Sequence, residues 1–317
     1  MPRDTILVTG SAGLIGSALS SALLRGDVSV IGLDLRAGAQ LRLDVRELSS
    51  RISELNDVSG IVHLAAVSRV IHGEQNPALC RSVNIEGTRA VLEVAARLPL
   101  RPWVILASSR EVYGEQRELP VREDAKLQPV NVYARSKVQA EQSVWQARAE
   151  GLRACIVRFS SVYGSVHDYP DRVVPAFAIA AARGGKVRVD GANGILDFTH
   201  VSDVATGLLC LISVVGARDL ELPPPIHFVS GIPTSLGRLA DLALEFGLPG
   251  TSVISAEPRD FDVHHFHGDP SFATELLEWK ATTELRVGFR RLVDDFKNGL
   301  ACSGETPKLF ALPHADF

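Results

Sequence analysis

The chain has 317 residues, of which 46% are hydrophobic and 22% are charged, close to the average for a water-soluble globular protein. This composition excludes extensive disorder and a fibrous fold, and the length allows one large domain or a core that carries a smaller second lobe. The formal net charge of -4 provides no basic surface for nucleic acid, so an anionic substrate has to be held by local amides and arginines.

The chain shows no pattern typical of secretion, membrane insertion or metal binding. The first strand-like segment begins near Thr5, which leaves no room for a signal peptide, and no apolar run approaches the ~20 residues of a membrane span. Four cysteines lie far apart without CxxC spacing: Cys80, Cys155, Cys210 and Cys302. We therefore expect a cytoplasmic protein without disulfides or a bound metal, and without a membrane or nucleic-acid partner.

Short β-branched runs alternate with longer amphipathic stretches through the first half of the chain. The expected strands are 6–8, 28–33, 60–64, 104–107 and 154–158, and the expected helices are 14–24, 47–55, 80–98 and 132–150. This alternation predicts an α/β fold with a doubly wound, parallel, Rossmann-type sheet. In such a sheet ligands bind beyond the carboxyl ends of the strands, so the residues that follow each strand are the candidates for function.

A glycine-rich turn follows the first predicted strand. Gly10, Gly13 and Gly16 have the spacing GxxGxxG and precede an apolar helix. Glycines at these places permit a tight turn, a close approach of the backbone to a pyrophosphate, and close packing of the helix on the strand. The spacing taken alone also fits a tight strand-to-helix turn without a ligand.

Acidic residues after the next strands refine this interpretation. Asp34 ends the second predicted strand, where a carboxylate can accept hydrogen bonds from an adenosine ribose. Its charge repels a 2′-phosphate, which favours NAD, although nearby Arg36 leaves NADP as an alternative. Asp44 and Val45 follow the next short segment and either meet the adenine or form a surface turn.

Three further residues indicate redox chemistry on a hydroxyl group. Tyr133 and Lys137 lie four residues apart, on one face of the helix predicted at 132–150. An ammonium beside the phenol stabilises a tyrosinate, so that Tyr133 can act as a base near neutral pH. Ser109 ends the fourth predicted strand and can polarise the same substrate oxygen. The set predicts hydride transfer between the substrate and a nicotinamide.

Taken in order, the motifs resemble those of the extended short-chain dehydrogenases/reductases of the NAD-dependent nucleotide-sugar epimerase/dehydratase family. They are TGSAGLIG (9–16), HLAAVS (63–68), NIEGT (84–88), SSREVYG (108–114), YARSK (133–137), RFSSVYG (158–164), DFTHVSD (197–203) and the stretch around Arg259. The resemblance covers nearly all of the chain. It implies an NAD cofactor, a nucleotide-sugar substrate, and a homodimer formed by helices near 85–98 and 132–149.

The resemblance also implies the residues of the site. Contacts to NAD are expected from Gly10, Gly13, Leu14, Ile15, Asp34, Leu35, Arg36, Asp44, Val45, Leu64, Ala65, Ala66, Ser68, Asn84, Ala107, Ser108, Tyr133, Lys137, Phe159 and Val162. Contacts to the substrate are expected from Ser68, Ser109, Glu111, Ser161, Val174 and Arg259. The expected catalytic residues are Ser109, Tyr133, Lys137 and Glu111.

The regular alternation weakens after about Gly164, and a Pro- and Asp-containing loop follows at 167–171. A further strand is expected at 226–229, after three consecutive prolines. We expect residues 1–164 to form the NAD-binding domain, with segments at about 197–230 returning to it. Residues 165–196 and 231–300 are then a smaller C-terminal substrate-binding lobe, and 301–317 a tail.

Two positions depart from the family pattern. Ser161 stands where members commonly carry Asn, and Leu196 stands where they commonly carry Arg. Both residues usually help to hold the nucleotide diphosphate. The diphosphate is therefore expected to sit differently, or to depend on Arg259 together with Arg183 or Arg188.

Glu111 bears on the type of reaction. Dehydratases and decarboxylases often carry Glu at this position, and a carboxylate beside the sugar can remove the C5 proton once C4 is a ketone; alternatively, Glu111 pairs with Arg110 or Arg158 and only shapes its loop. Some dehydratases carry an acid directly before this Glu, whereas this chain carries Arg110, which does not readily donate a proton. The sequence thus favours an epimerase that oxidises C4 transiently. The alternatives are a dehydratase or decarboxylase, and a non-catalytic NAD(P)-sensing protein of the same fold.

Overall fold

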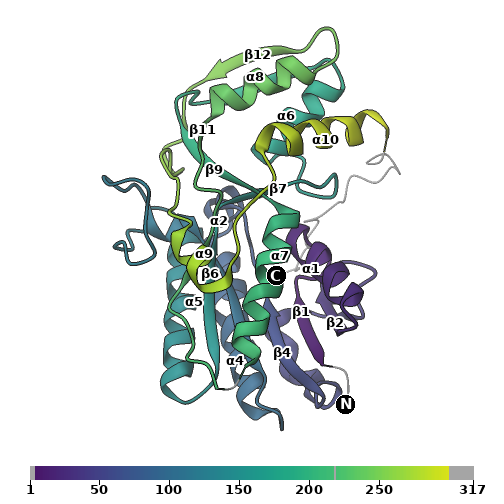
Figure 1. Ribbon diagram of the computed structural model, residues 1–317, viewed down its shortest axis with the longest axis vertical. Coiled ribbons are helices and arrows are strands. Elements are labelled where there is room, and N and C mark those ends of the chain that lie inside the picture. The colour runs from purple at the N-terminus through teal and green to yellow at the C-terminus, as the bar shows by residue number, and fades with distance from the viewer. Residues whose placement is uncertain (1–3, 218, 300–317) are drawn as a thin grey trace, which may run out of the picture.

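The computed structural model describes residues 4–217 and 219–299. Figure 1 shows a larger lobe, built on a sheet with helices packed against it, and a smaller lobe above the upper ends of the strands. The tail expected at 301–317, with Cys302, lies outside the described residues.

In the described part of the chain, the larger lobe contains a seven-stranded sheet with the order β10-β6-β5-β4-β1-β2-β3. Its strands are β1 (Thr5–Thr9), β2 (Ser29–Asp34), β3 (Leu41–Arg42), β4 (Val58–His63), β5 (Trp103–Ser109), β6 (Ala154–Phe159) and β10 (Ile226–Phe228). All neighbouring strands are parallel. The direction of winding reverses between β1 and β4, where a ligand crevice is expected. The prediction of a doubly wound Rossmann-type sheet is confirmed.

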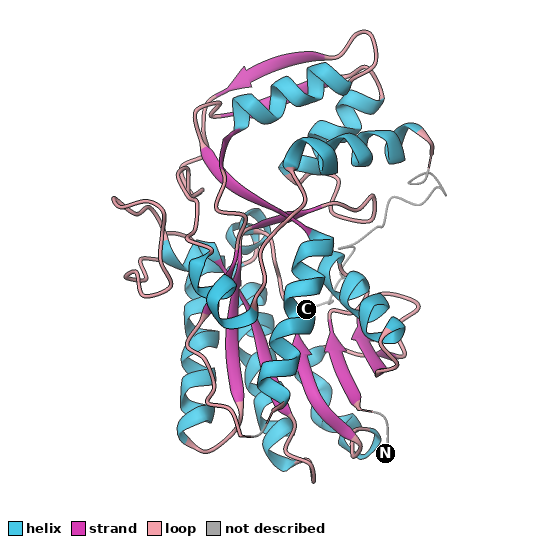
Figure 2. Cartoon of the chain, viewed as in Figure 1, coloured by secondary structure: helices cyan, strands magenta, loops and turns pink. Residues whose placement is uncertain are grey.

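Helices cover both faces of this sheet, as Figure 2 shows. On one face lie α1 (Leu14–Arg25) and α7 (Val201–Gly216), whose apolar side chains share one hydrophobic cluster with the sheet. On the other face lie α4 (Gly87–Arg97) and α5 (Val132–Ala149), which share a second cluster with it. No helix in the described ranges is long and apolar enough to cross a membrane.

Two expected helices have a different form in the structure. The segment expected at 47–55 is a 3-10 helix, η1 (Val45–Glu54), with a kink at Arg51. Ser50 lies in its middle and its hydroxyl donates to the Glu47 carbonyl, a local bond that competes with the α-helical ladder. The helix expected at 80–98 is divided into α3 (Pro77–Arg81), a π-helical turn at Ser82–Glu86, and α4.

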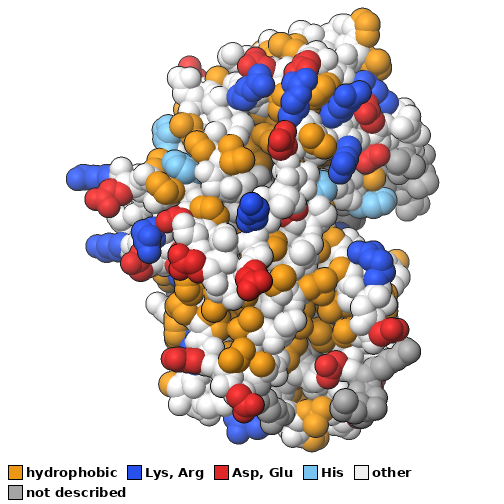
Figure 3. All heavy atoms as spheres, viewed as in Figure 1, with side chains coloured by type: hydrophobic (Ala, Val, Ile, Leu, Met, Phe, Trp, Pro, Cys, Tyr) orange, Lys and Arg blue, Asp and Glu red, His pale blue; other side chains and the backbone are white. Residues whose placement is uncertain are grey.

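The smaller lobe is a mixed α/β layer that sequence periodicity did not predict in detail. Its helices are α6 (Val173–Ala182), α8 (Leu236–Phe246) and α10 (Leu285–Lys297). Its strands are β7 (Ser161–Tyr163), β8 (Lys186–Asp190), β9 (Ile195–His200), β11 (Pro233–Ser235) and β12 (Ser252–Ala256). Figure 3 shows that basic side chains on the drawn face of this lobe are interleaved with acidic ones.

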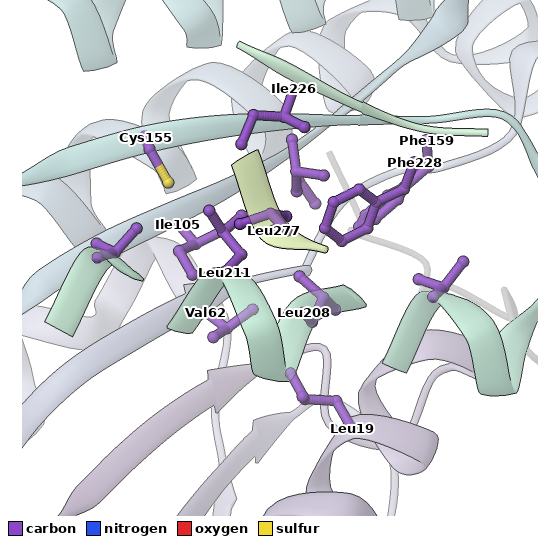
Figure 4. Close-up of a cluster of buried hydrophobic side chains, with 14 of the residues drawn as sticks. Leu19, Val62, Ile105, Cys155, Phe159, Leu208, Leu211, Ile226, Phe228 and Leu277 are labelled. Carbon is purple, nitrogen blue, oxygen red and sulfur yellow. The ribbon is translucent and has the colours of Figure 1, made fainter. Parts of the chain in front are cut away.

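The core beneath the crevice joins elements that are distant in the sequence. Figure 4 shows Leu19 of α1 and Leu208 of α7 close to Val62 and Ile105 of the sheet. Helix α9 (Ser271–Leu277), from the C-terminal part of the chain, adds apolar side chains to the same cluster. This packing fixes the strand ends from which the crevice is built.

Replacing Leu208 by Ala tests this core. Leu208 is fully buried between α7 and the sheet, so the substitution should lower the free energy of unfolding by about 2–5 kcal/mol. Urea denaturation followed by circular dichroism measures the change. Leu24→Ala is the matched control, because Leu24 is 62% exposed and its loss should cost less than about 0.5 kcal/mol. Equal effects of the two substitutions would contradict the described packing.

Candidate active site

A cleft of about 770 Å³ lies between the two lobes, at the carboxyl ends of the strands of the larger sheet. The cleft is lined by every described residue that the sequence singled out for cofactor, substrate or catalysis, except Asn84 and Arg183. Asn84 instead lies behind the wall. Its side chain accepts from the Val67 backbone N–H at 2.8 Å and donates to Ser136 Oγ at 2.8 Å, so its amide is already occupied.

The glycine turn has the shape that a dinucleotide pyrophosphate requires. Gly10 has a φ of 71°, and a Cβ there would lie 2.8 Å from the backbone nitrogen of Ala65. A Cβ on Gly16 would lie 2.1 Å from the carbonyl oxygen of Gly10, so the helix approaches the turn closely. Gly13 is the N-cap of α1 and has no side chain to block its first turn, where the helix dipole favours an anion.

Asp34 is held in place at the end of β2. Its two carboxylate oxygens accept from the backbone N–H groups of Ala12 and Arg36, each at 3.0 Å. Arg36 in turn donates to the Ala12 carbonyl at 2.7 Å. Asp34 therefore faces the glycine turn with its orientation fixed before any ligand binds.

Asp44 both lines the cleft and caps η1. It is paired with Arg46 at 2.7 Å, and the side-chain hydrogen bond from Arg46 lowers the pKa of Asp44. The sequence offered two interpretations of Asp44, contact with the adenine or a surface turn. In the structure Asp44 lines the cleft and also caps a helix, so its position is compatible with both.

Tyr133 and Lys137 project from the first turns of α5. Burial raises the pKa of Tyr133 to about 12, while a hydrogen bond with Ser109 lowers it in part. Lys137 Nζ donates to the carbonyl of Ala107 at 2.9 Å and lies 6.0 Å from the centre of the Tyr133 ring. Burial lowers the pKa of Lys137 to about 8. Without a ligand the Tyr133 phenol therefore keeps its proton at neutral pH. A positive charge on Lys137 favours the loss of this proton.

Glu111 lies in the cleft wall and has two protein partners. It is 2.9 Å from Arg110 and accepts from Asn131 Nδ2 at 3.0 Å. The pairing with Arg110 matches one of the interpretations made from the sequence. Arg158, the other partner considered, is instead paired with Glu141 at 2.7 Å. Asn131 is also the N-cap of α5, so Glu111 is tied to the helix that carries Tyr133.

The opposite end of the cleft belongs to the smaller lobe. Ser161, Val174 and Leu196 line it together with Arg259 and Arg188. Arg259 is paired with Asp262 at 2.6 Å, yet its side chain remains 48% exposed and can turn towards an anion. Arg183 is not among the lining residues, which leaves Arg259 and Arg188 as the candidates named from the sequence.

Sequence reasoning missed a group of cleft residues near the cofactor side. Arg69, Tyr169 and Arg172 all line the cleft, and Arg172 donates to Ser68 Oγ at 3.1 Å. Tyr169 belongs to the loop that the sequence marked only by its Pro and Asp content. No group of three or more His, Cys, Asp or Glu in residues 4–217 and 219–299 is arranged to hold a metal ion.

A glycine turn after β1, an acid at the end of β2 and a Ser–Tyr–Lys set facing one cleft define a dinucleotide-binding protein of the short-chain dehydrogenase/reductase class. The chain belongs to the NAD dependent epimerase/dehydratase family of enzymes, whose model matches residues 6–219.

Known relatives cover nearly the whole chain. A putative UDP-glucose 4-epimerase from Methanocaldococcus jannaschii is 30% identical over 310 residues, which cover 92% of this chain and 98% of that protein. The crystal structure of a UDP-glucose 4-epimerase from Thermotoga maritima with UDP-glucose is similar at a TM-score of 0.85 and 26% identity, covering 93% of this chain and 99% of that one. The NAD dependent NDP-hexosamine 5,6-dehydratase TunA, involved in tunicamycin biosynthesis, is similar at a TM-score of 0.83 and 28% identity, covering 92% and 97%.

The fixed position of Asp34 generates a prediction about cofactor preference. The native protein should bind NAD more tightly than NADP, because the carboxylate repels a 2′-phosphate. Asp34→Ala and Asp34→Asn should both weaken this preference, and Asp34→Asn retains an acceptor for the Ala12 N–H. Direct titration with the two dinucleotides measures the ratio. Tighter binding of NADP to the native protein would refute the prediction.

Proposed function

We propose that this protein binds NAD in the cleft and converts a nucleotide-linked sugar into its C4 epimer by transient oxidation at C4. The observation that carries the proposal is the convergence of Ser109, Tyr133 and Lys137 on one end of a cleft whose other end holds Arg259. The family relationship and the two epimerases described above support the same activity. The fit of the glycine turn and of Asp34 to a dinucleotide supports the choice of cofactor.

Each member of the catalytic set has a distinct task. NAD, when bound, supplies the acceptor and donor of the hydride at C4. Tyr133 acts as a tyrosinate, a state that the charge of Lys137 favours: its phenolate oxygen takes the proton of the C4 hydroxyl group, and the phenol formed in this way later returns it, while Ser109 orients the oxygen by hydrogen bonding. Lys137 holds positive charge beside the phenol and is anchored by the Ala107 carbonyl, so its ammonium cannot swing away.

The smaller lobe would hold the nucleotide end of the substrate. Arg259 and Arg188 can pair with the diphosphate, and Val174 lies in the first turn of α6, where backbone N–H groups favour an anion. Leu196 provides no charge. Binding of the diphosphate therefore depends more on these groups here than it would if position 196 were Arg. The substrate-binding lobe expected at 165–196 and 231–300 is part of this proposal with two changes: α9 packs into the core of the larger lobe, and β7 and β9 belong to the small sheet of the smaller lobe.

We also infer that the protein acts in the cytoplasm as a homodimer formed through α4 and α5. The side chain of Trp145 on α5 is 43% exposed, and burial of such a large apolar surface would stabilise association. Equilibrium sedimentation of the native protein and of Trp145→Asp tests this interface.

A dehydratase or decarboxylase is the second candidate, and Glu111 is the observation that favours it. Glu111 lines the cleft beside Ser109, and its side chain is only 8% exposed, so its carboxylate could remove a proton from C5 of a 4-keto sugar. Arg110 precedes it and supplies no acid for elimination of water. Screening nucleotide sugars for turnover, with products identified by NMR, identifies both the substrate and the reaction.

Tyr133→Phe should abolish nearly all turnover and leave NAD binding largely intact, because only the hydroxyl is removed. Lys137→Ala should reduce both turnover and NAD affinity, since its ammonium reaches the same region as the cofactor ribose. Product formation and NAD titration are measured on the same preparations. An active Tyr133→Phe enzyme would show that another group is the base.

Turnover in deuterated water separates the two candidate reactions. An epimerase that returns the same hydride to C4 places no solvent deuterium on the carbon skeleton, whereas a reaction with Glu111 as the C5 base does. If Glu111 is that base, Glu111→Gln should lower kcat by on the order of 10²-fold or more. We expect no deuterium at C5. Deuterium at C5 together with an inactive Glu111→Gln variant would overturn epimerisation in favour of the second candidate.

A further inference from the structure

Tyr169 lies at the centre of a cluster of guanidinium groups that the proposed chemistry does not use. Among the described residues, three arginines have their guanidinium carbons close to the Tyr169 ring centre: Arg36 at 5.7 Å, Arg69 at 5.5 Å and Arg172 at 5.4 Å. The Arg36 side chain also donates to the Tyr169 hydroxyl at 3.4 Å. We call Tyr169, Arg36, Arg69 and Arg172 the Tyr169 cluster.

The Tyr169 cluster joins the two lobes across the switch point of the sheet. Arg36 follows β2 and holds the glycine turn after β1 through the Ala12 carbonyl. Arg69 follows β4, and the Tyr169 ring is nearly perpendicular to that of His72 of α2 (Val70–Gln75), with 6.1 Å between the ring centres. Tyr169 itself belongs to the loop that leads into α6. This loop therefore bridges the segments that follow β1, β2 and β4, which is where the pyrophosphate of a dinucleotide crosses the sheet edge.

The charges of the Tyr169 cluster favour an anion at this place. Arg69 is paired with Asp171, and Arg172 lies 3.7 Å from Asp168. The Arg36 guanidinium instead donates to the Ala12 carbonyl and to the Tyr169 hydroxyl, neither of which carries a charge. Guanidinium groups form strong charge-assisted hydrogen bonds to phosphate oxygens, and α1 presents its positive end to the same cleft.

A second observation also points to a ligand. Asp168 lines the cleft, its side chain is 2% exposed, and its Oδ2 atom has no hydrogen-bond partner among the described residues. A buried carboxylate oxygen without a donor is costly, and a hydroxyl of a ribose could supply the missing hydrogen bond. Polar groups of both signs thus converge from this loop on the cofactor side of the cleft.

We propose that the Tyr169 cluster is a clasp that closes over the pyrophosphate of the bound dinucleotide and retains it between turnovers. The inference rests on the proposed binding of NAD. A reaction that removes and then returns the same hydride leaves the cofactor in its starting state, so the enzyme gains nothing from releasing it. Tyr169 is then a cofactor-retaining residue, and breaking its contacts opens the route by which the dinucleotide leaves.

The test measures how fast the cofactor dissociates. Protein loaded with fluorescent etheno-NAD is mixed with excess NAD, and the decay of the signal gives the dissociation rate constant. Tyr169→Ala removes three cation–π contacts and should increase this rate constant by on the order of tenfold. Tyr169→Phe keeps the ring and should stay within about twofold of the native value, because the hydrogen bond that it loses is long.

Phe246→Ala is the matched control. Phe246 of α8 also lies under two guanidinium groups, those of Arg286 and Arg290, but on the smaller lobe away from the cleft. Its loss should leave the dissociation rate constant of etheno-NAD unchanged. A melting temperature of ligand-free Tyr169→Ala equal to that of the native protein shows that the clasp variant is folded.

Arg36→Met tests the clasp while leaving Tyr169 in place. It should accelerate dissociation and reduce the dependence of the rate constant on salt, because screening acts on the contact between guanidinium and phosphate. A rate constant within twofold of the native value for both Tyr169→Ala and Arg36→Met would overturn the clasp. Failure of the native protein to bind etheno-NAD would instead overturn the proposed function, so the two failures are distinguishable.

Discussion

The buried ion pair between Arg158 of β6 and Glu141 of α5 is the interaction on which the catalytic end of the cleft depends. Two hydrogen bonds, of 3.0 and 2.7 Å, join the two side chains, and Ser108 also donates to Glu141. Glu141 follows Lys137 by one helical turn, so the pair fixes the rotation of α5 and with it the direction of Lys137. Removing one partner would strand a charge in the core, which typically costs about 3–5 kcal/mol.

The site could be predicted from the sequence wherever one residue type serves one geometric need. Gly10 and Gly16 can be predicted because a side chain at either position would collide with the neighbouring backbone. Asp34 can be predicted because it ends the strand that follows the glycine turn, where a carboxylate faces that turn. Tyr133 and Lys137 were found because a four-residue spacing places both on one helix face. Six of the seven described strands of the larger sheet could likewise be predicted, since buried parallel strands are continuous apolar runs, whereas the two-residue strand β3 is too short to give such a run.

Other features left no local signal in the sequence. Glu141 looks like any helix-surface acid, and only the packing of β6 against α5 shows that it is buried beside Arg158. Tyr169 and Arg172 occupy a loop whose composition suggests only a turn, and their partners lie far away in the chain. Asn84 shows the opposite case: it belongs to a recognised motif, yet the structure places its side chain behind the wall of the cleft, where it holds the Val67 backbone. Contacts of this kind arise from tertiary packing, which periodicity does not report.

The position of β10 in the sheet has a consequence for biosynthesis. β10 pairs in parallel with β6, yet between these strands the chain leaves the sheet to build β7, α6, β8, β9 and α7. Until residue 228 has left the ribosome, β6 remains an edge strand with unpaired backbone groups, the kind of edge that promotes aggregation. Closing the sheet over so long a separation also raises the contact order, which slows folding. Part of the smaller lobe must therefore be synthesised before the larger lobe can complete its own sheet.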